Sequence, residues 1–184
     1  MELKDYSGPY QPGFKIEDLS KESLVRLVQR YWRLFQEVDG FWYLSVMKNV
    51  SDEQALVCDL WVWEREAKRE VRGLAQALNI QGDDVATLMK IYQVEPYLGN
   101  MEYEIELVNE NHSVLTVTKC RLLEALEKEG GMRINTICGK VDPIIFRHYA
   151  EAINPDMQVQ ALKLPPRRNQ DDICCQWEYK LERK

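Results

Sequence analysis

Free thiols are the side chains best suited to chemistry in this 184-residue chain, which contains five cysteines. Cys120 follows a strand-like run, Cys138 precedes a predicted helix, and Cys174 and Cys175 open the last predicted strand. A zinc site needs three or four nitrogen or sulfur ligands about 2.0–2.3 Å from the ion. Cys120, Cys138 and Cys175 could supply three ligands, with His148 or water as the fourth.

Other roles for these thiols stay open. The chain has no C-x-x-C pair, and free cysteines are often small buried hydrophobic residues. Side chains alternate along a strand, so we expect Cys175 to point inward with Trp177 and Tyr179, and Cys174 to point outward. A catalytic thiolate needs a lowered pKa, and Cys138, just before the predicted helix start at Asp142, is the best placed for one.

Acidic and aromatic residues form a second candidate site on two predicted helices. Asp39 and Asp59 lie in aromatic, otherwise apolar surroundings, where a carboxyl group can gain a raised pKa suited to proton transfer. Trp42 and Trp63 are candidate ligand-binding residues beside them. The alternative is that Asp39 caps a helix break and that nearby arginines screen both acids.

A later predicted helix carries His148 and Tyr149, which we also consider as ligand-binding residues. A histidine on such an apolar face is more often a hydrogen-bonded core residue than a ligand. With His112 in a predicted turn, a site built from several histidines is excluded.

Composition narrows the class of protein. The net charge of −6 argues against a nucleic-acid-binding surface, and no run approaches the roughly 20 apolar residues of a membrane helix. The polar first 13 residues do not resemble a signal peptide, and an odd number of cysteines favours a reducing compartment. These observations predict a soluble cytoplasmic protein. The common nucleotide-binding and hydrolase motifs are also absent.

Hydrophobic periodicity divides the chain at about residue 98. Residues 1–18 are predicted to be an extended arm, followed by one α+β domain over 19–184. Its helical part, 19–98, contains a helix capped by Ser20, a possible break at Asp39–Gly40, and a long helix over about 52–78. Trp61 and Trp63 point about 200° apart on that helix, so one should line the core.

The second part, 99–184, is predicted to fold in the order ββααββ. Two alternating runs, 101–119 and 157–181, flank a pair of helices, and the first run has an acidic outer face. The fold class is therefore α+β, with N-terminal helices packed on an antiparallel sheet of about four strands.

Three segments resemble a known group of proteins: "RYWRLFQEVDGFWYLSVMKNV", "ICGKVDPIIFRHYAEAINPDMQV" and "LPPRRNQDDICCQWEYKL". The group consists of uncharacterised prokaryotic cytosolic proteins related to L-2-amino-thiazoline-4-carboxylic acid hydrolase-like proteins, and more distantly similar to vinyl-4-reductase domains. The resemblance covers about residues 18–182. It implies cysteines equivalent to Cys120, Cys138 and Cys175, and ring-opening hydrolysis in some members. The group also tends to carry cysteines just before the Pro-Pro pair, where this chain has Ala161, Leu162 and Leu164.

Two functions follow as expectations. The first is a small-molecule-binding or sensor-like protein with a cysteine cluster at its pocket. The alternative is an amide- or thiazoline-type hydrolase that uses a cysteine or a cysteine-bound zinc, with Asp39 or Asp59 carrying a proton. No nucleic acid or membrane partner is expected, and a homodimer is compatible with the sequence.

Overall fold

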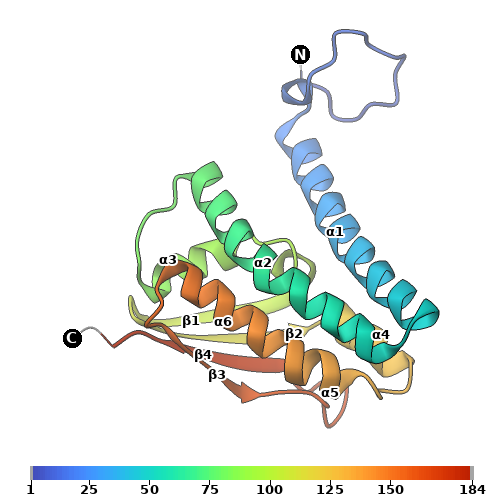
Figure 1. The fold of residues 1–184 in the computed structure, drawn as a ribbon. Helices are drawn as coiled ribbons and strands as arrows, with labels where there is room; N and C mark the ends of the chain where they lie inside the picture. The colour runs from blue at the N-terminus through green and yellow to red at the C-terminus, as the bar shows by residue number, and fades with distance from the viewer. Residues whose placement is uncertain (1, 183–184) are drawn as a thin grey trace.

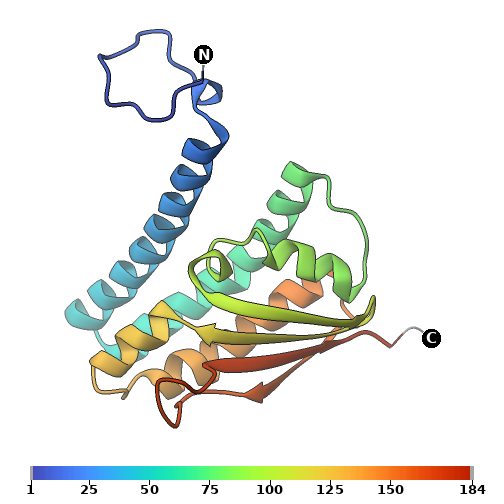
Figure 2. The same ribbon diagram turned by 180° about the vertical axis from the view of Figure 1, so that it is seen from behind.

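The computed structural model describes residues 2–182, which form a four-stranded antiparallel sheet with helices on one face and a long helix projecting from the body (Figures 1 and 2). This is the α+β class that the two periodicities predict. Neither the two long helices nor any other helix of the described chain combines the length and hydrophobicity that crossing a bilayer requires.

The helical part begins with α1 (Lys21–Asn49), α2 (Asp52–Leu78) and α3 (Val85–Tyr92). Ser20, Ser51 and Asp84 cap these helices, each with a side-chain oxygen that accepts a hydrogen bond from a first-turn backbone N–H. Residues 2–19 curl back on themselves, since Leu3 forms a parallel bridge with Leu19 beside the 3₁₀ turn η1 (Ile16–Asp18).

The break expected at Asp39–Gly40 is wrong, because α1 continues through both residues. One glycine costs a helix only about 1 kcal/mol, and packing of the helix against the body outweighs that cost. The Asp39 carboxylate accepts a hydrogen bond from the Tyr97 hydroxyl (2.6 Å) and so ties this point of α1 to the loop that follows α3.

The sheet contains β1 (Glu102–Asn109), β2 (His112–Lys119), β3 (Gln158–Lys163) and β4 (Cys175–Lys180), in the order β1-β2-β4-β3. Both predicted hairpin regions therefore share one sheet, as expected. The outer face of β1 carries exposed Glu102, Glu104 and Glu106. On β4, Trp177 and Tyr179 are fully buried, so the inward face has the predicted parity.

Between the hairpins lie α4 (Arg121–Lys128), the short α5 (Ile134–Thr136), the π-helical turn η3 (Ile137–Val141) and α6 (Asp142–Ile153). The sequence predicts a helix that starts at Asp142. It instead follows a π turn without interruption, because Val141 already has helical dihedral angles. Such turns often occur at functional sites, and this one contains Cys138.

The core lies between the sheet and the layer formed by α2, α3 and α6 (Figure 1). The short helical turn η2 (Leu98–Asn100) connects α3 to β1 and lies against α1. The middle of α1 packs against η2 through Trp32 and its C-terminal half packs on α2, whereas its first turns extend away from the body (Figures 1 and 2).

Candidate functional site

A cavity of about 90 Å³ lies inside this layered core. A water molecule needs roughly 10–15 Å³ of such space, so the cavity has room for several waters or a small organic molecule. Residues from α1, α2, α6, the loop after α3 and the β2–β4 region all contribute to its wall. The cavity is thus assembled from segments that are far apart in the sequence.

Four carboxyl groups line the cavity: Asp39 from α1, Asp59 from α2, Glu95 from the loop after α3, and Asp142 at the start of α6. None of the described residues in the lining is a lysine, arginine or histidine. Buried charges normally require a partner of opposite charge. In the protein alone these acids can therefore be neutralised only by protons.

Burial is the main cause of the altered acidity of these groups. It raises the pKa of Asp59 to about 7, and repulsion from Asp39 and Asp142 adds to the effect. Burial raises the pKa of Asp142 to about 7, and that of Asp39 as well. Burial together with the nearby Glu70 raises the pKa of Glu95 to about 8, although the backbone N–H groups of Tyr97 and Leu98 donate to its carboxylate.

Aromatic rings make up much of the remaining wall. Trp63 and Tyr97 pack edge-to-face with ring centroids 5.0 Å apart, next to Asp39 and Asp59. Tyr92 and Phe146 cover another part, with centroids 5.9 Å apart. Tyr149 also lines the cavity, and its hydroxyl donates to Glu70. The faces of such rings attract cations.

Cys120, Cys138, Cys174 and Cys175 gather at the end of the cavity near the start of β4. Val117 on β2 is paired with Cys175 on β4, which brings Cys120 and the two adjacent cysteines together. The inward direction of Cys175 is confirmed. The outward direction of Cys174 is wrong: it precedes the regular strand, is buried, and its thiol donates to the Thr118 carbonyl (3.4 Å).

The environment of these thiols disfavours the thiolate. Burial raises the pKa of Cys120 to about 12, and this sulfur already caps α4 by accepting from the Leu123 N–H (3.4 Å). Burial, with repulsion from the neighbouring Asp142, raises the pKa of Cys138 further still. The lowered pKa expected for Cys138 is therefore not found, because a carboxyl group and not a cation lies beside it.

A zinc site does not fit the residues as they are placed. Within residues 2–182, no group of three or more histidine, cysteine, aspartate or glutamate side chains is arranged to hold a metal ion. His148 does not line the cavity, and its Nδ1 lies 3.2 Å from Glu151 Oε2. The fourth ligand suggested from the sequence is therefore turned away from the thiols.

The other predicted site residues are divided between cavity and surface. Asp39, Asp59, Trp63 and Tyr149 line the cavity as expected. Trp42 does not line it and is 69% exposed on α1, so its contact with a ligand stays a prediction. Trp63 is buried while Trp61 is exposed under the Arg65 guanidinium, as their angular separation required.

Sequence reasoning missed Glu95, Tyr92 and Tyr97 and treated Asp142 only as a helix cap. One signal was available for Glu95, which is a single acidic residue within the apolar run Ile91–Met101. Isolated acids in such runs are either hydrogen-bonded or functional. Glu95 is buried and faces the cavity.

Comparison with known proteins places the chain in a family. Residues 17–181 match the family described as "Family of unknown function (DUF6125)", and the chain belongs to it. No curated protein matches the chain, and no solved structure does so either.

Proposed function

We propose that this protein binds a small organic cation, such as a protonated amine with a short apolar group, in the cavity between its helices and sheet. The observation that carries the proposal is the lining itself: four carboxyl groups and several aromatic rings surround one cavity, and none of the described residues that line it is basic. A bound cation would replace the protons on these acids, and the ring faces would contact its alkyl groups.

The size of the cavity limits the ligand. A cavity of 150 Å³ accepts benzene, so one of about 90 Å³ suits a molecule with fewer heavy atoms. A propylammonium ion has suitable size and charge. Its matched isosteres are propanol, which is neutral, and propionate, which is anionic.

Binding of these three probes tests the proposal. Isothermal titration at pH 8.5 should show propylammonium binding at least about tenfold more tightly than propanol, and no binding of propionate. Asp59→Asn should weaken propylammonium binding and leave propanol unchanged. Exposed Glu53→Gln, on the same helix, is the control. Equal affinities for propylammonium and propanol would contradict a cation site.

A hydrolase remains the second candidate, supported by the pairing of Cys138 with Asp142 at the cavity wall. Asp142 could accept the thiol proton as sulfur adds to the C=N carbon of a thiazoline or the C=O carbon of an amide, whose π bond breaks and leaves its electron pair on nitrogen or oxygen. The raised pKa of Cys138 means that its thiol is protonated in the free protein. A hydrolase would therefore require the proton to move to Asp142 while the sulfur attacks. Ring-opening of an amino-thiazoline that is lost in Cys138→Ala and kept in Cys58→Ala would favour it over simple binding.

A further inference from the structure

The projecting helix α1 has two different apolar faces. One face meets the body: Trp32 lies against Gly99, Phe35 packs on Trp63 and Tyr97, and Tyr43 donates to Asp52 (3.0 Å). The second face is formed by residues spaced alternately three and four apart. Its members, hereafter the outer seam, are Leu24, Leu27, Tyr31, Leu34, Val38 and Phe41.

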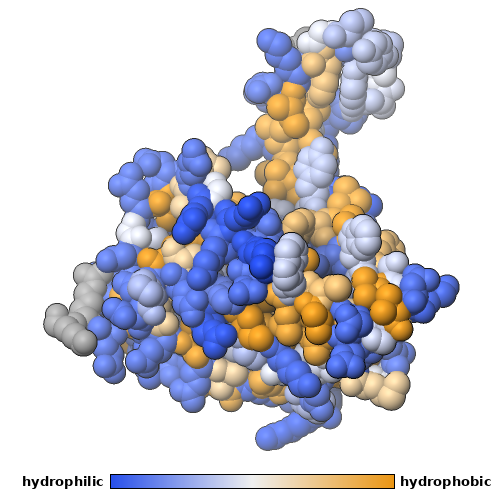
Figure 3. Space-filling model, viewed as in Figure 1, coloured by the Kyte–Doolittle hydropathy of each residue, from blue (hydrophilic) through white to orange (hydrophobic). Residues whose placement is uncertain are grey.

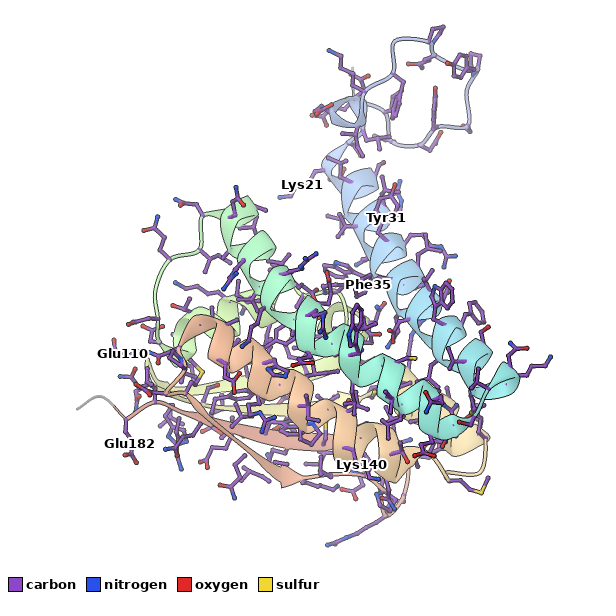
Figure 4. The ribbon with its side chains drawn as sticks, viewed as in Figure 1. Lys21, Tyr31, Phe35, Glu110, Lys140 and Glu182 are labelled. Carbon is purple, nitrogen blue, oxygen red and sulfur yellow. The ribbon has the colours of Figure 1, made fainter. Side chains whose placement is uncertain are left out.

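The outer seam has no partner within the described chain over most of its length. Tyr31, Val38 and Phe41 are 57%, 54% and 70% exposed. Figure 3 shows hydrophobic side chains gathered along the projecting part of α1, and Figure 4 shows Tyr31 on this part, beyond the level at which Phe35 meets the body. Such a continuous apolar stripe is unusual on a surface that stays in water.

The spacing identifies the kind of partner. A repeat of three and four residues is the a/d pattern of a coiled coil, in which side chains of one helix pack between those of another. The seam from Leu24 to Phe41 covers about 27 Å of helix, which is five turns. The shape of the surface therefore matches a second helix and not a flat surface or a peptide strand.

The exposed area is sufficient for a dimer. A buried aromatic side chain contributes about 150–250 Å², so Tyr31, Phe41 and the flanking Trp42 together offer roughly 400 Å² at their observed exposures. A stable interface buries about 800 Å² on each partner. The three aromatic residues alone provide about half of that area, and the aliphatic members of the seam add to it.

Two charged residues beside the outer seam indicate which helix pairs with it and whether the two helices run parallel or antiparallel. Arg30 and Glu37 each precede a seam residue, Tyr31 and Val38, and lie on the same edge, where they form an ion pair (3.2 Å). In an antiparallel pair of identical helices this edge meets its own copy, so Arg30 lies near the partner's Glu37, and Glu37 near the partner's Arg30. In a parallel pair the same edge meets the side that carries Phe35 and Trp42.

We propose that α1 pairs with α1 of a second copy of this chain, antiparallel and two-fold symmetric, through the outer seam. The dimer is independent of the ligand proposed above, because the seam residues do not line the cavity. It uses the outer seam along both the projecting part and the packed part of α1, and it explains why Trp42, which flanks the seam, is apolar and exposed.

Mass measurement tests the pairing. Sedimentation velocity from about 1 to 100 μM should give twice the 21.7 kDa chain mass for the native protein. Val38→Glu places one charge from each copy in the seam and should raise the dissociation constant at least about a hundredfold. Val108→Glu on β1 is the matched control, since Val108 is 53% exposed and should leave the dimer intact. A monomeric native protein, or equal effects of the two variants, would overturn the proposal.

Disulfide trapping tests the direction. In a Cys58→Ser background, Arg30→Cys with Glu37→Cys should form cross-linked dimers under mild oxidation. Glu37→Cys alone should not, because its own copy lies on the far side of the two-fold axis. Val38→Cys alone should not cross-link either, because Val38 faces its own copy only in a parallel pair; efficient cross-linking of Val38→Cys would overturn the antiparallel arrangement. Circular dichroism of each variant confirms that the fold is retained.

Discussion

At the scale of single residues, the unusual feature is a set of acids that share one enclosed space without a counter-ion. Asp39, Asp59, Glu95 and Asp142 come from four elements and are hydrogen-bonded only to hydroxyl, thiol, indole or backbone donors. Their raised pKa values follow from burial. Burial thus favours the protonated form of these groups in the free protein.

Stability should therefore fall as the pH rises from about 5 to 8.5. Asp59, Asp142 and Glu95 have pKa values of about 7, 7 and 8 in the fold, above those of the unfolded chain, so the folded state binds more protons over this range. The stabilisation is complete below the unfolded pKa and is lost through pH 7–8. Each group should contribute up to about 4 kcal/mol.

Urea unfolding at pH 5, 7 and 8.5 measures this effect, and Asp59→Asn should flatten the profile. Ion-paired surface acids make stability rise with pH, but only at lower pH, where these acids lose their protons. The Arg167 guanidinium lowers the pKa of Glu127, and the Lys163 ammonium group lowers that of Asp172. A stability that rises steadily from pH 5 to 8.5 would show that the cavity acids are ionised in the free protein.

The thiols allow a second prediction at this scale. Cys58 is exposed, whereas Cys120, Cys138 and Cys174 are buried and Cys175 is half-buried. Iodoacetamide at pH 8 should modify Cys58 at least about a hundredfold faster than Cys138 in the native protein, because burial suppresses both access and ionisation. Peptide mass spectrometry reads each site. Rapid alkylation of Cys138 would contradict the inert role and favour the hydrolase.

Some residue roles could be read from the sequence and others could not. The inward direction of Cys175 followed from strand alternation, which depends only on local geometry. The burial of Cys174 did not, because it lies one residue before the regular strand begins. The exposure of Trp42 and the position of His148 depend on which face of a helix meets the body, and an apolar residue fits either face.

At the scale of elements, the sheet was predictable and the helix junctions were less so. Alternating apolar residues in two runs predicted both hairpins, and their joining in one sheet follows from the pairing of β2 with β4. The π turn before α6 had no signature in the sequence, because it differs from an α-helix only by one extra residue per turn.

Two glycines make the contact between α1 and the body testable. A Cβ atom added to Gly99 would lie 2.3 Å from Trp32 Cε3, so Gly99→Ala should destabilise the fold by about 1–3 kcal/mol by displacing the indole. Gly40, inside α1, has no atom within 4 Å of an added Cβ. Gly40→Ala should therefore stabilise the protein by about 0.5–1 kcal/mol.

Denaturant midpoints compare the two variants directly. The pair also tests whether α1 of each chain packs on its own η2 turn. Equal, small effects of both substitutions would indicate that Trp32 does not rest against Gly99 in solution.

At the scale of the whole molecule, the cavity is where all the layers meet. The long helices provide Asp39 and Asp59, the start of α4, the η3 turn and the start of β4 provide the cysteines, and α6 provides Asp142 and Tyr149. Its existence could not be inferred from any one segment, because it depends on how α1, α2 and α6 approach the sheet. The sequence supported a small-molecule pocket in general terms, and the arrangement of its acids suggests the charge of the ligand.

Proton release on ligand binding tests this account most directly. Propylammonium titrated at pH 7 in phosphate and in HEPES, which differ in ionisation enthalpy, gives the number of protons exchanged on binding. We predict a net release of about one proton per bound cation, because carboxyl groups with pKa values of about 7 to 8 ionise when the cation enters. Asp59→Asn should reduce this release. Heats that are identical in the two buffers, or no binding in either, would contradict a cavity in which a cation replaces protons on buried acids.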